Sequence, residues 1–218
     1  MIPLRDVIPS RTVPFVTVII IVLNAAAWIL EISMAPRALE EFLTVYGVVP
    51  AMFRPITLVT SMFLHGGWSH IIGNMWFLWI FGDNVEDAFG HGRFIVFYLL
   101  CGMTAALGQI IMDPASRLPT IGASGAIAGV MGAYFVLYPR SRVLTLIPPF
   151  VFNVIEVPAI FLLGFWFLMQ LVDAGAVAAT ASTGGGGVAF AAHVAGFVVG
   201  VVGVFVFRRR RQPSAWEA

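Results

Sequence analysis

Six apolar stretches, each long enough to cross a lipid bilayer as a helix, constrain this chain more than any other feature of its sequence. A spanning helix needs about 20 largely apolar residues. Only 11% of the residues are charged, against about 25% in an ordinary soluble domain. We therefore predict an all-α membrane protein, a six-helix transmembrane bundle that forms one domain over residues 1–218. The predicted spans cover about 13–32, 68–85, 94–112, 121–138, 154–172 and 188–207.

The arginines indicate which ends of these helices face the cytoplasm, because cytoplasmic flanks of membrane spans are enriched in basic residues. With the N-terminus inside, nine of the 12 basic residues lie inside, and only Arg37, Arg54 and Arg117 lie outside. An even number of spans then places both termini in the cytoplasm. We expect the long outer loop 33–67 to lie partly in the membrane interface, and segment 180–187 to be a flexible linker before the last span.

Charge and cysteine content exclude some classes of function. The net charge is +1, which does not favour nucleic-acid binding. The one cysteine, Cys101, lies in an apolar run, so no disulfide framework is possible. The lipid bilayer is the expected surrounding, and we expect no cofactor and no metal.

Polar side chains inside the predicted spans mark a candidate site, because ionisable groups are costly there. Ser124 and His193 each lie 14 residues from the inner end of their span, and His70 lies 13 residues from Asp83 at the inner end of its own. With a rise of about 1.5 Å per residue, all three sit roughly 20 Å above the inner boundary. In a hydrocarbon core of about 30 Å, this level is about 10 Å below the outer surface.

The spacing of small residues predicts that the fourth and sixth spans lie face to face. Small residues that recur every three or four positions let membrane helices approach closely. Ser124 and His193 would then become neighbours, and His70 and Asn74, four residues apart, would share one helix face. The small residues that support this packing and these motifs are Gly122, Gly125, Gly196 and Gly200.

These residue types fit acyl-transfer chemistry. A serine hydroxyl becomes a good nucleophile when an adjacent base takes its proton, and a neutral histidine is the usual base. We expect Ser124 to be the nucleophile and His193 the base. The oxyanion that forms needs hydrogen-bond donors, which His70, Asn74 and the backbone N–H of Ser124 could supply. No carboxylate is predicted at this depth, so we expect a Ser–His dyad, with Asp173 at the outer rim as the open alternative.

Each residue also has a purely structural interpretation. Ser124 and Asn74 are residue types that commonly stabilise contacts between membrane helices. His193 alone could form an interhelical hydrogen bond, and the glycines more often serve packing than chemistry. Their joint occurrence at one depth favours a site.

Three motifs carry a family resemblance. Segment 65–74 resembles the His…His-x-x-x-Asn signature of rhomboid intramembrane proteases, segment 122–129 resembles their nucleophile motif, and segment 192–200 resembles their catalytic-histidine helix. The resemblance implies a compact six-span prokaryotic form, a multi-pass protein of the inner or plasma membrane. It also implies a serine endopeptidase that cuts single-pass transmembrane proteins near the outer membrane face through an acyl-enzyme.

By the same resemblance, Ser124 and His193 form the dyad, and His70, Asn74 and Ser124 form the oxyanion hole. His65 matches a histidine that supports the first loop. Some relatives carry a tyrosine, stacked on the histidine, where this chain has Ala128, so whatever positions His193 here differs from theirs or is missing. We expect an outward-facing cavity roofed by loop 33–67 and linker 180–187, and a lateral gate in the fifth span, which carries Pro158 and Gly164.

Three other functions stay open at this point. The chain could be an inactive relative, although such relatives usually lack the serine or the histidine. A small transporter or channel would need a polar track across the whole bilayer, whereas the polar groups here gather in the outer third. A metalloprotease using His65, His70 and His193 would lack the His-Glu-x-x-His pattern.

Overall fold

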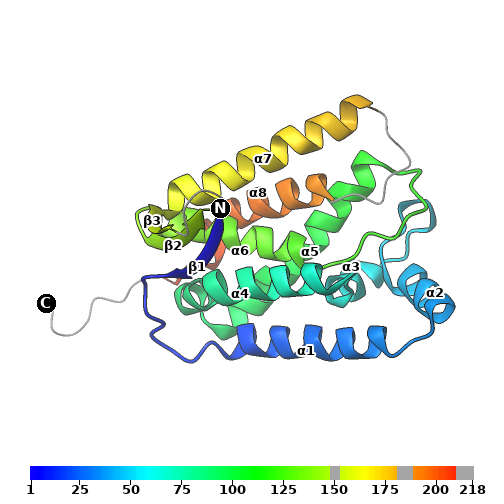
Figure 1. Cartoon of the computed structure of the whole chain (residues 1–218), viewed down its shortest axis with the longest axis horizontal. Helices are drawn as coiled ribbons and strands as arrows, with labels where there is room; N and C mark the ends of the chain where they lie inside the picture. The colour runs from blue at the N-terminus through cyan, green and yellow to red at the C-terminus, as the bar shows by residue number, and fades with distance from the viewer. Residues whose placement is uncertain (148–152, 181–188, 210–218) are drawn as a thin grey trace, which may run out of the picture.

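The computed structural model of the chain describes residues 1–147, 153–180 and 189–209. Its long helices run side by side in one bundle, with α6 and α8 inside and α1 and α7 on opposite flanks (Figure 1). The long helices are α1 (Phe15–Ile32), α4 (Trp68–Phe89), α5 (His91–Met112), α6 (Ser124–Leu137), α7 (Ala159–Thr180) and α8 (Phe190–Phe207).

Among the described residues, four helices are long and apolar enough to cross a membrane: α1, α5, α7 and α8. The other two predicted spans coincide with α4 and α6. Helix α4 has 22 residues, and its last two turns carry Asp83, Glu86 and Asp87. Helix α6 is apolar but has only 14 residues, about 21 Å at 1.5 Å per residue. The chain is therefore a mostly helical, multi-pass membrane protein.

The predicted loop 33–67 contains helices of its own. They are α2 (Pro36–Tyr46), the 3₁₀ helix η1 (Pro50–Met52), α3 (Thr57–Thr60) and the 3₁₀ helix η2 (Ser61–Phe63). A bridge between Val48 and Thr120 ties this region to the segment before α6. Helix α2 has no buried residue and lies at the far end of the bundle from the β-strands (Figure 1).

The prediction of an all-α fold was wrong in one respect, because one end of the bundle carries a three-stranded antiparallel sheet in the order β1-β2-β3. The strands are β1 (Ile2–Asp6), β2 (Arg142–Ile147) and β3 (Asn153–Pro158). The fifth helix therefore begins at Ala159 and not near 154. Residues 154–158 are apolar enough to extend a predicted span, but their β-branched residues favour a strand. Pro158 ends β3, opposite Arg142, so it is not part of a gating helix.

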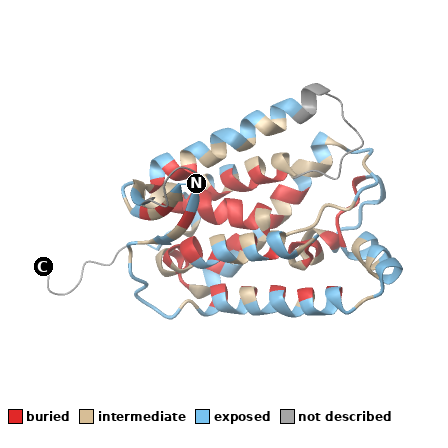
Figure 2. Cartoon of the chain, in the orientation of Figure 1, coloured by how far each residue is buried: buried red, intermediate tan, exposed pale blue. Residues whose placement is uncertain are grey.

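The interior of the bundle is formed by α6 against α8, α5 and α4. Ten consecutive residues of α6, Gly125 to Tyr134, are buried, whereas α1 and α7 are exposed along their outer faces (Figure 2). This exposure is expected for helices that border lipid, and it leaves α6 as the element around which the other helices are placed.

A buried carboxylate at the inner end of α4 holds the start of α1. Glu86 is fully buried, and its oxygens accept the backbone N–H groups of Val16 and Thr17 and the Thr17 hydroxyl at 2.7–2.9 Å. The His91 Nδ1 atom lies 2.5 Å from the same carboxylate. Since Pro14 provides no side-chain cap, Glu86 satisfies N–H groups that the first turn of a helix leaves free.

Replacing Glu86 by glutamine should therefore lower the free energy of unfolding by about 1–3 kcal/mol, because the amide turns an N–H donor toward other donors in a buried site. Unfolding in detergent, followed by circular dichroism, measures the change. Glu41→Gln is the matched control, since Glu41 makes only an exposed pair with Arg37 that should contribute less than about 1 kcal/mol. Equal effects of the two substitutions would contradict a capping role for Glu86.

Asp6 should make the attachment of β1 dependent on pH. Its carboxylate accepts the Tyr134 hydroxyl at 2.7 Å and the Asn84 amide at 3.2 Å. Burial, with a smaller contribution from Asp83, raises the pKa of Asp6 to about 6. The folded state therefore binds the Asp6 proton more tightly than the unfolded chain does. Protonated Asp6 thus stabilises the folded state below about pH 4, and this stabilisation is lost as the pH rises through 6.

Hydrogen exchange of the β1 amides, corrected for intrinsic rates, should show greater protection at pH 5 than at pH 7.5. Asp6→Asn should remove most of this difference. A pH dependence that persists unchanged in the variant would show that another group controls it.

Candidate active site

The side chains of Ser124 and His193 meet near one end of the two central helices. Ser124 is the first residue of α6, and His193 lies in the first turn of α8. Ser124 Oγ lies 2.8 Å from His193 Nε2, which is hydrogen-bonding distance. His193 is buried, with 8% of its surface exposed, so a low-dielectric setting surrounds the pair.

Glycines permit this meeting, because α6 and α8 touch backbone to backbone. A Cβ atom added to Gly196 would lie under 3.0 Å from the carbonyl oxygen of Gly125, and one added to Gly200 would lie under 3.0 Å from that of Gly129. Such contacts are closer than real Cβ atoms show. Three of the four small residues singled out in the sequence, Gly125, Gly196 and Gly200, therefore lie at the α6–α8 contact.

The other ring nitrogen of His193 has a partner that the sequence analysis missed. His193 Nδ1 lies 2.6 Å from Oε1 of Gln170 on α7. Trp166, one turn earlier on α7, lies beside the same ring, with centroids 5.8 Å apart and planes at 37°. The side chain bonded to Nδ1 is thus a neutral amide and not the carboxylate of Asp173. Gln170 could have been suspected as a polar residue within the fifth predicted span, four residues after a tryptophan.

His70 and Asn74 face the backbone just before Ser124. Gly122 has φ of +121°, a conformation that favours glycine. A Cβ atom there would lie 2.7 Å from His70 Nε2 and 3.6 Å from Asn74 Nδ2. The His70 Nδ1 atom accepts the Gly66 N–H at 3.3 Å, so a neutral His70 carries its proton on Nε2. Two side-chain N–H groups therefore converge on the space beside Gly122.

His65 lies behind these donors. Its Nε2 atom lies 3.0 Å from Asn74 Nδ2, and its ring makes an edge contact with that of His70, with centroids 5.1 Å apart. Burial, and to a lesser degree His70, lowers the pKa of His65 to about 4. His65 is then neutral at physiological pH, and its Nε2 can accept a hydrogen bond from Asn74.

Glu31 at the end of α1 is a second residue that the sequence analysis missed. It is fully buried, and its Oε2 atom accepts the backbone N–H of His65 at 3.0 Å. As an acidic residue within the first predicted span, it met the criterion that singled out the histidines. Glu31 thus links α1 to the loop that carries His65.

Gly122→Ala should reduce any reaction that uses the space beside Gly122. The added methyl group would collide with His70 Nε2, and alanine would have to adopt the φ of +121°, which is unfavourable for any residue but glycine. Displacing one oxyanion donor lowers kcat by about 10²- to 10³-fold in serine proteases, and we expect an effect of that size in a peptide-cleavage assay. Gly67→Ala is the control, because a Cβ atom there has no neighbour within 4 Å. Equal activities of the two variants would contradict a donor site beside Gly122.

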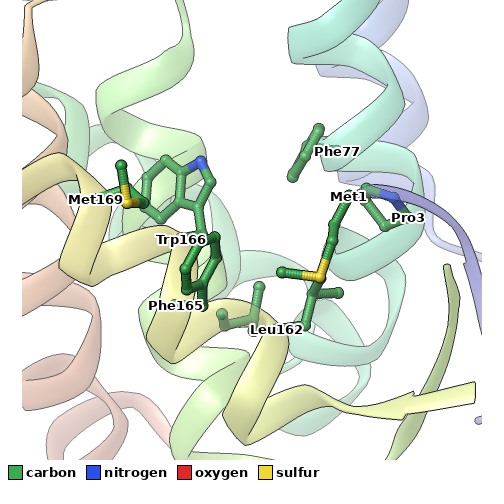
Figure 3. Close-up of a pocket in the computed structure, with 8 residues that line it drawn as sticks. Met1, Pro3, Phe77, Leu162, Phe165, Trp166 and Met169 are labelled. Carbon is green, nitrogen blue, oxygen red and sulfur yellow. The ribbon is translucent and has the colours of Figure 1, made fainter. Parts of the chain in front are cut away.

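An apolar cavity of about 110 Å³ lies between α7, α4 and β1. Trp166 and Phe165 of α7 face Phe77 of α4 across it, and Met1, which precedes β1, reaches into it (Figure 3). Trp166 thus borders both this cavity and His193. Gly164, the other residue suggested for a gate, lies near Phe135 of α6. Linker 180–187, suggested as part of a roof, lies outside the described residues except for Thr180, which ends α7.

Within the part of the chain that the structure describes, no group of three or more His, Cys, Asp or Glu side chains could hold a metal ion. The three histidines proposed for a metalloprotease therefore do not form a ligand set. Cys101 is buried in α5.

The comparisons with known proteins all find rhomboid proteins. The family model described as the Rhomboid domain matches residues 52–210. Rhomboid protease GluP of Bacillus subtilis is 37% identical over 118 residues, which are 53% of this chain and 22% of that protein. The chloroplastic Rhomboid-like protein 11 of Arabidopsis thaliana is 28% identical over 204 residues, 85% of this chain and 66% of that protein.

A further relative is the Putative rhomboid protease YdcA of Bacillus subtilis, 29% identical over 129 residues, which are 58% of this chain and 64% of that protein. The chain spans less than two thirds of the length of each of these three curated relatives.

Proposed function

The chain belongs to the rhomboid family, and we propose that it is an intramembrane serine endopeptidase that cleaves single-pass transmembrane proteins near the outer membrane face. The observation that carries the proposal is the 2.8 Å contact between Ser124 Oγ and His193 Nε2. The relatives named as rhomboid proteases support the same reaction class.

In the proposed reaction, His193 Nε2 takes the hydroxyl proton as Ser124 Oγ bonds to the carbonyl carbon of the substrate. The resulting intermediate collapses when the peptide C–N bond breaks, and His193 gives the proton to the leaving amine. An ester between Ser124 and the acyl part of the substrate remains. Water, deprotonated by His193, then attacks this ester and releases the second product.

The proposed oxyanion hole consists of His70 Nε2–H, one N–H of Asn74 and the backbone N–H of Ser124. The side-chain donors converge beside Gly122, two residues before the nucleophile. Ser124 begins a helix, where backbone N–H groups have no partner within the helix and the helix dipole favours negative charge. His65 and Glu31 would support this hole by holding Asn74 and the loop before α4.

An inactive relative that only binds membrane proteins is the alternative. The presence of both Ser124 and His193, at hydrogen-bonding distance, favours the enzyme. The test is to reconstitute the purified protein in liposomes with a model single-pass substrate and to identify the products by mass spectrometry. We expect one main cut near the outer end of the substrate helix. Stable binding of the substrate without any cut would favour the alternative.

The proposed membrane arrangement has six crossings within one domain and both termini in the cytoplasm, in a prokaryotic inner or plasma membrane. Support comes from the arginine distribution and from the bacterial relatives. It also comes from the sheet and the end of α8, which contact the same end of α4 through Asp6–Asn84 and Arg209–Ala88. The oligomeric state is left open.

Cysteine labelling tests this arrangement with little background, because the native Cys101 is fully buried. Ala38→Cys, on the exposed α2, should react with a membrane-impermeant maleimide in intact cells. Gly92→Cys, at a position with open space around it, should react only after the cells are opened. The reverse pattern would invert the topology.

A further inference from the structure

Gln170 offers an account of how His193 is oriented. Both ring nitrogens of His193 are engaged, Nε2 with Ser124 Oγ at 2.8 Å and Nδ1 with Gln170 Oε1 at 2.6 Å. An amide oxygen only accepts hydrogen bonds. A neutral His193 must therefore carry its proton on Nδ1, which leaves the lone pair of Nε2 directed at the serine hydroxyl.

This tautomer is the one that a general base needs. If the proton resided on Nε2, the ring would donate to Ser124 Oγ and could not take its proton. In a serine protease with a complete triad, holding the wrong tautomer lowers kcat by about 10⁴-fold. Within the described residues, Gln170 is the side chain bonded to Nδ1, so it occupies the place that a carboxylate holds in a triad.

A neutral acceptor suits this depth. A carboxylate buried near the membrane interior carries a large desolvation cost, whereas an amide oxygen accepts the same hydrogen bond without a net charge. Trp166 lies on the same face of α7, four residues before Gln170, and its ring lies beside the imidazole. Helix α7 thus supplies both a hydrogen bond and a ring contact to His193.

Helix α7 is also the least embedded of the four candidate spans. Only 17% of the stretch Ala159–Ala176 of α7 is buried, against 33–39% of the corresponding stretches of α1, α5 and α8. It docks on α8 through the stacked rings of Phe167 and Phe197, with centroids 4.4 Å apart, and an apolar cavity lies between it and α4. Gln170 and Trp166, which contact the His193 ring, therefore lie on a helix that is exposed along most of its length.

From these contacts we propose that Gln170 is a positioning residue that fixes His193 in the Nδ1–H tautomer and so keeps its Nε2 atom free to act as the base. The proposal rests on the proposed function for its catalytic consequence. The structural part, the tautomer of His193, can be tested without any activity.

The test compares Gln170→Leu, Gln170→Glu and the control Gln109→Leu, which makes the same amide-to-alkyl change on α5. Nitrogen NMR of ¹⁵N-histidine-labelled protein reports the tautomer of each of the four histidines, with His193→Asn used to assign the signal. We expect wild type and Gln109→Leu to show the Nδ1–H form. Gln170→Leu should show a mixture, and Gln170→Glu should keep the Nδ1–H form because it keeps an acceptor.

In the cleavage assay, kcat should fall about 10²-fold or more in Gln170→Leu with KM little changed. It should stay within about tenfold of wild type in Gln170→Glu. A merely structural role would lower the stability of Gln170→Leu and leave the tautomer unchanged. An Nδ1–H signal as complete in Gln170→Leu as in wild type would overturn the proposal, whether or not the protein cleaves substrate.

If Gln170→Leu does not fold, Gln170→Asn replaces it, since the shorter amide cannot reach Nδ1 without moving α7 and should also give a mixture. Absence of cleavage by the wild type, together with a normal Nδ1–H signal, would instead count against the proposed function alone. The two failures are therefore distinguishable.

Discussion

Replacing Ser124 by alanine is expected to lower kcat for a model transmembrane substrate by about 10⁴- to 10⁶-fold. The alanine removes the atom that attacks the carbonyl carbon, and His193 has no other hydroxyl hydrogen-bonded to its Nε2 among the described residues. Alanine is a good helix former, so α6 should begin at the same residue. Product formation in liposomes, quantified by mass spectrometry, measures the change.

Ser33→Ala is the matched control, because Ser33 is exposed at the end of α1 and bonds only to a backbone carbonyl there. Its activity should equal that of the wild type. Both variants should elute and unfold like the wild type. Cleavage by Ser124→Ala at more than about one hundredth of the wild-type rate would mean that another group is the nucleophile.

Gly200→Val should lower both the free energy of unfolding and the activity. A Cβ atom at this position would lie under 3.0 Å from the carbonyl oxygen of Gly129, and neither backbone can move without separating α6 from α8. Overpacking of this kind typically costs about 1–3 kcal/mol, and more where nothing can yield. Separation also moves His193 from Ser124, and a shift of about 1 Å can lower a rate by about 10²-fold.

Unfolding in detergent and the cleavage assay together measure this effect. Gly175→Val on α7 is the control, since a Cβ atom there has no neighbour within 4 Å. It should lose well under about 1 kcal/mol, and its activity should be near that of the wild type. If Gly200→Val were as stable and active as the control, backbone contact between α6 and α8 would not be what holds the pair together.

Much of the bundle could be predicted from the sequence because apolar length is a strong signal in membrane proteins. The first, third and sixth predicted spans differ from their helices by no more than three residues at either end. The same signal misled at 154–158, where an apolar run is a β-strand at the end of the bundle. Apolar content alone does not separate a strand from the start of a span. Residues 154–158 pair with the neighbouring strand β2, and the sheet is completed by β1, which is distant in the sequence.

The site could be predicted in part for a physical reason. The depth of a residue and the spacing of small residues can both be counted along one helix at a time. Comparing them between helices was enough to suggest that Ser124 and His193 are neighbours. Their catalytic roles stay predictions. Gln170 was missed because only the packing of α7 against α8 shows that its side chain reaches His193, and a lone glutamine in a span carries no charge. Glu31 was missed although it is ionisable, because its position at the end of a span resembles that of an ordinary interface residue.

The most direct test of the proposed function is to treat the folded protein with a fluorophosphonate and to map the adduct by mass spectrometry. If His193 activates Ser124, the label should reside on Ser124, should be absent in Ser124→Ala, and should form at least about 10²-fold more slowly in His193→Asn. A label on another serine, or equal labelling of Ser124 with and without His193, would contradict a Ser124–His193 catalytic pair.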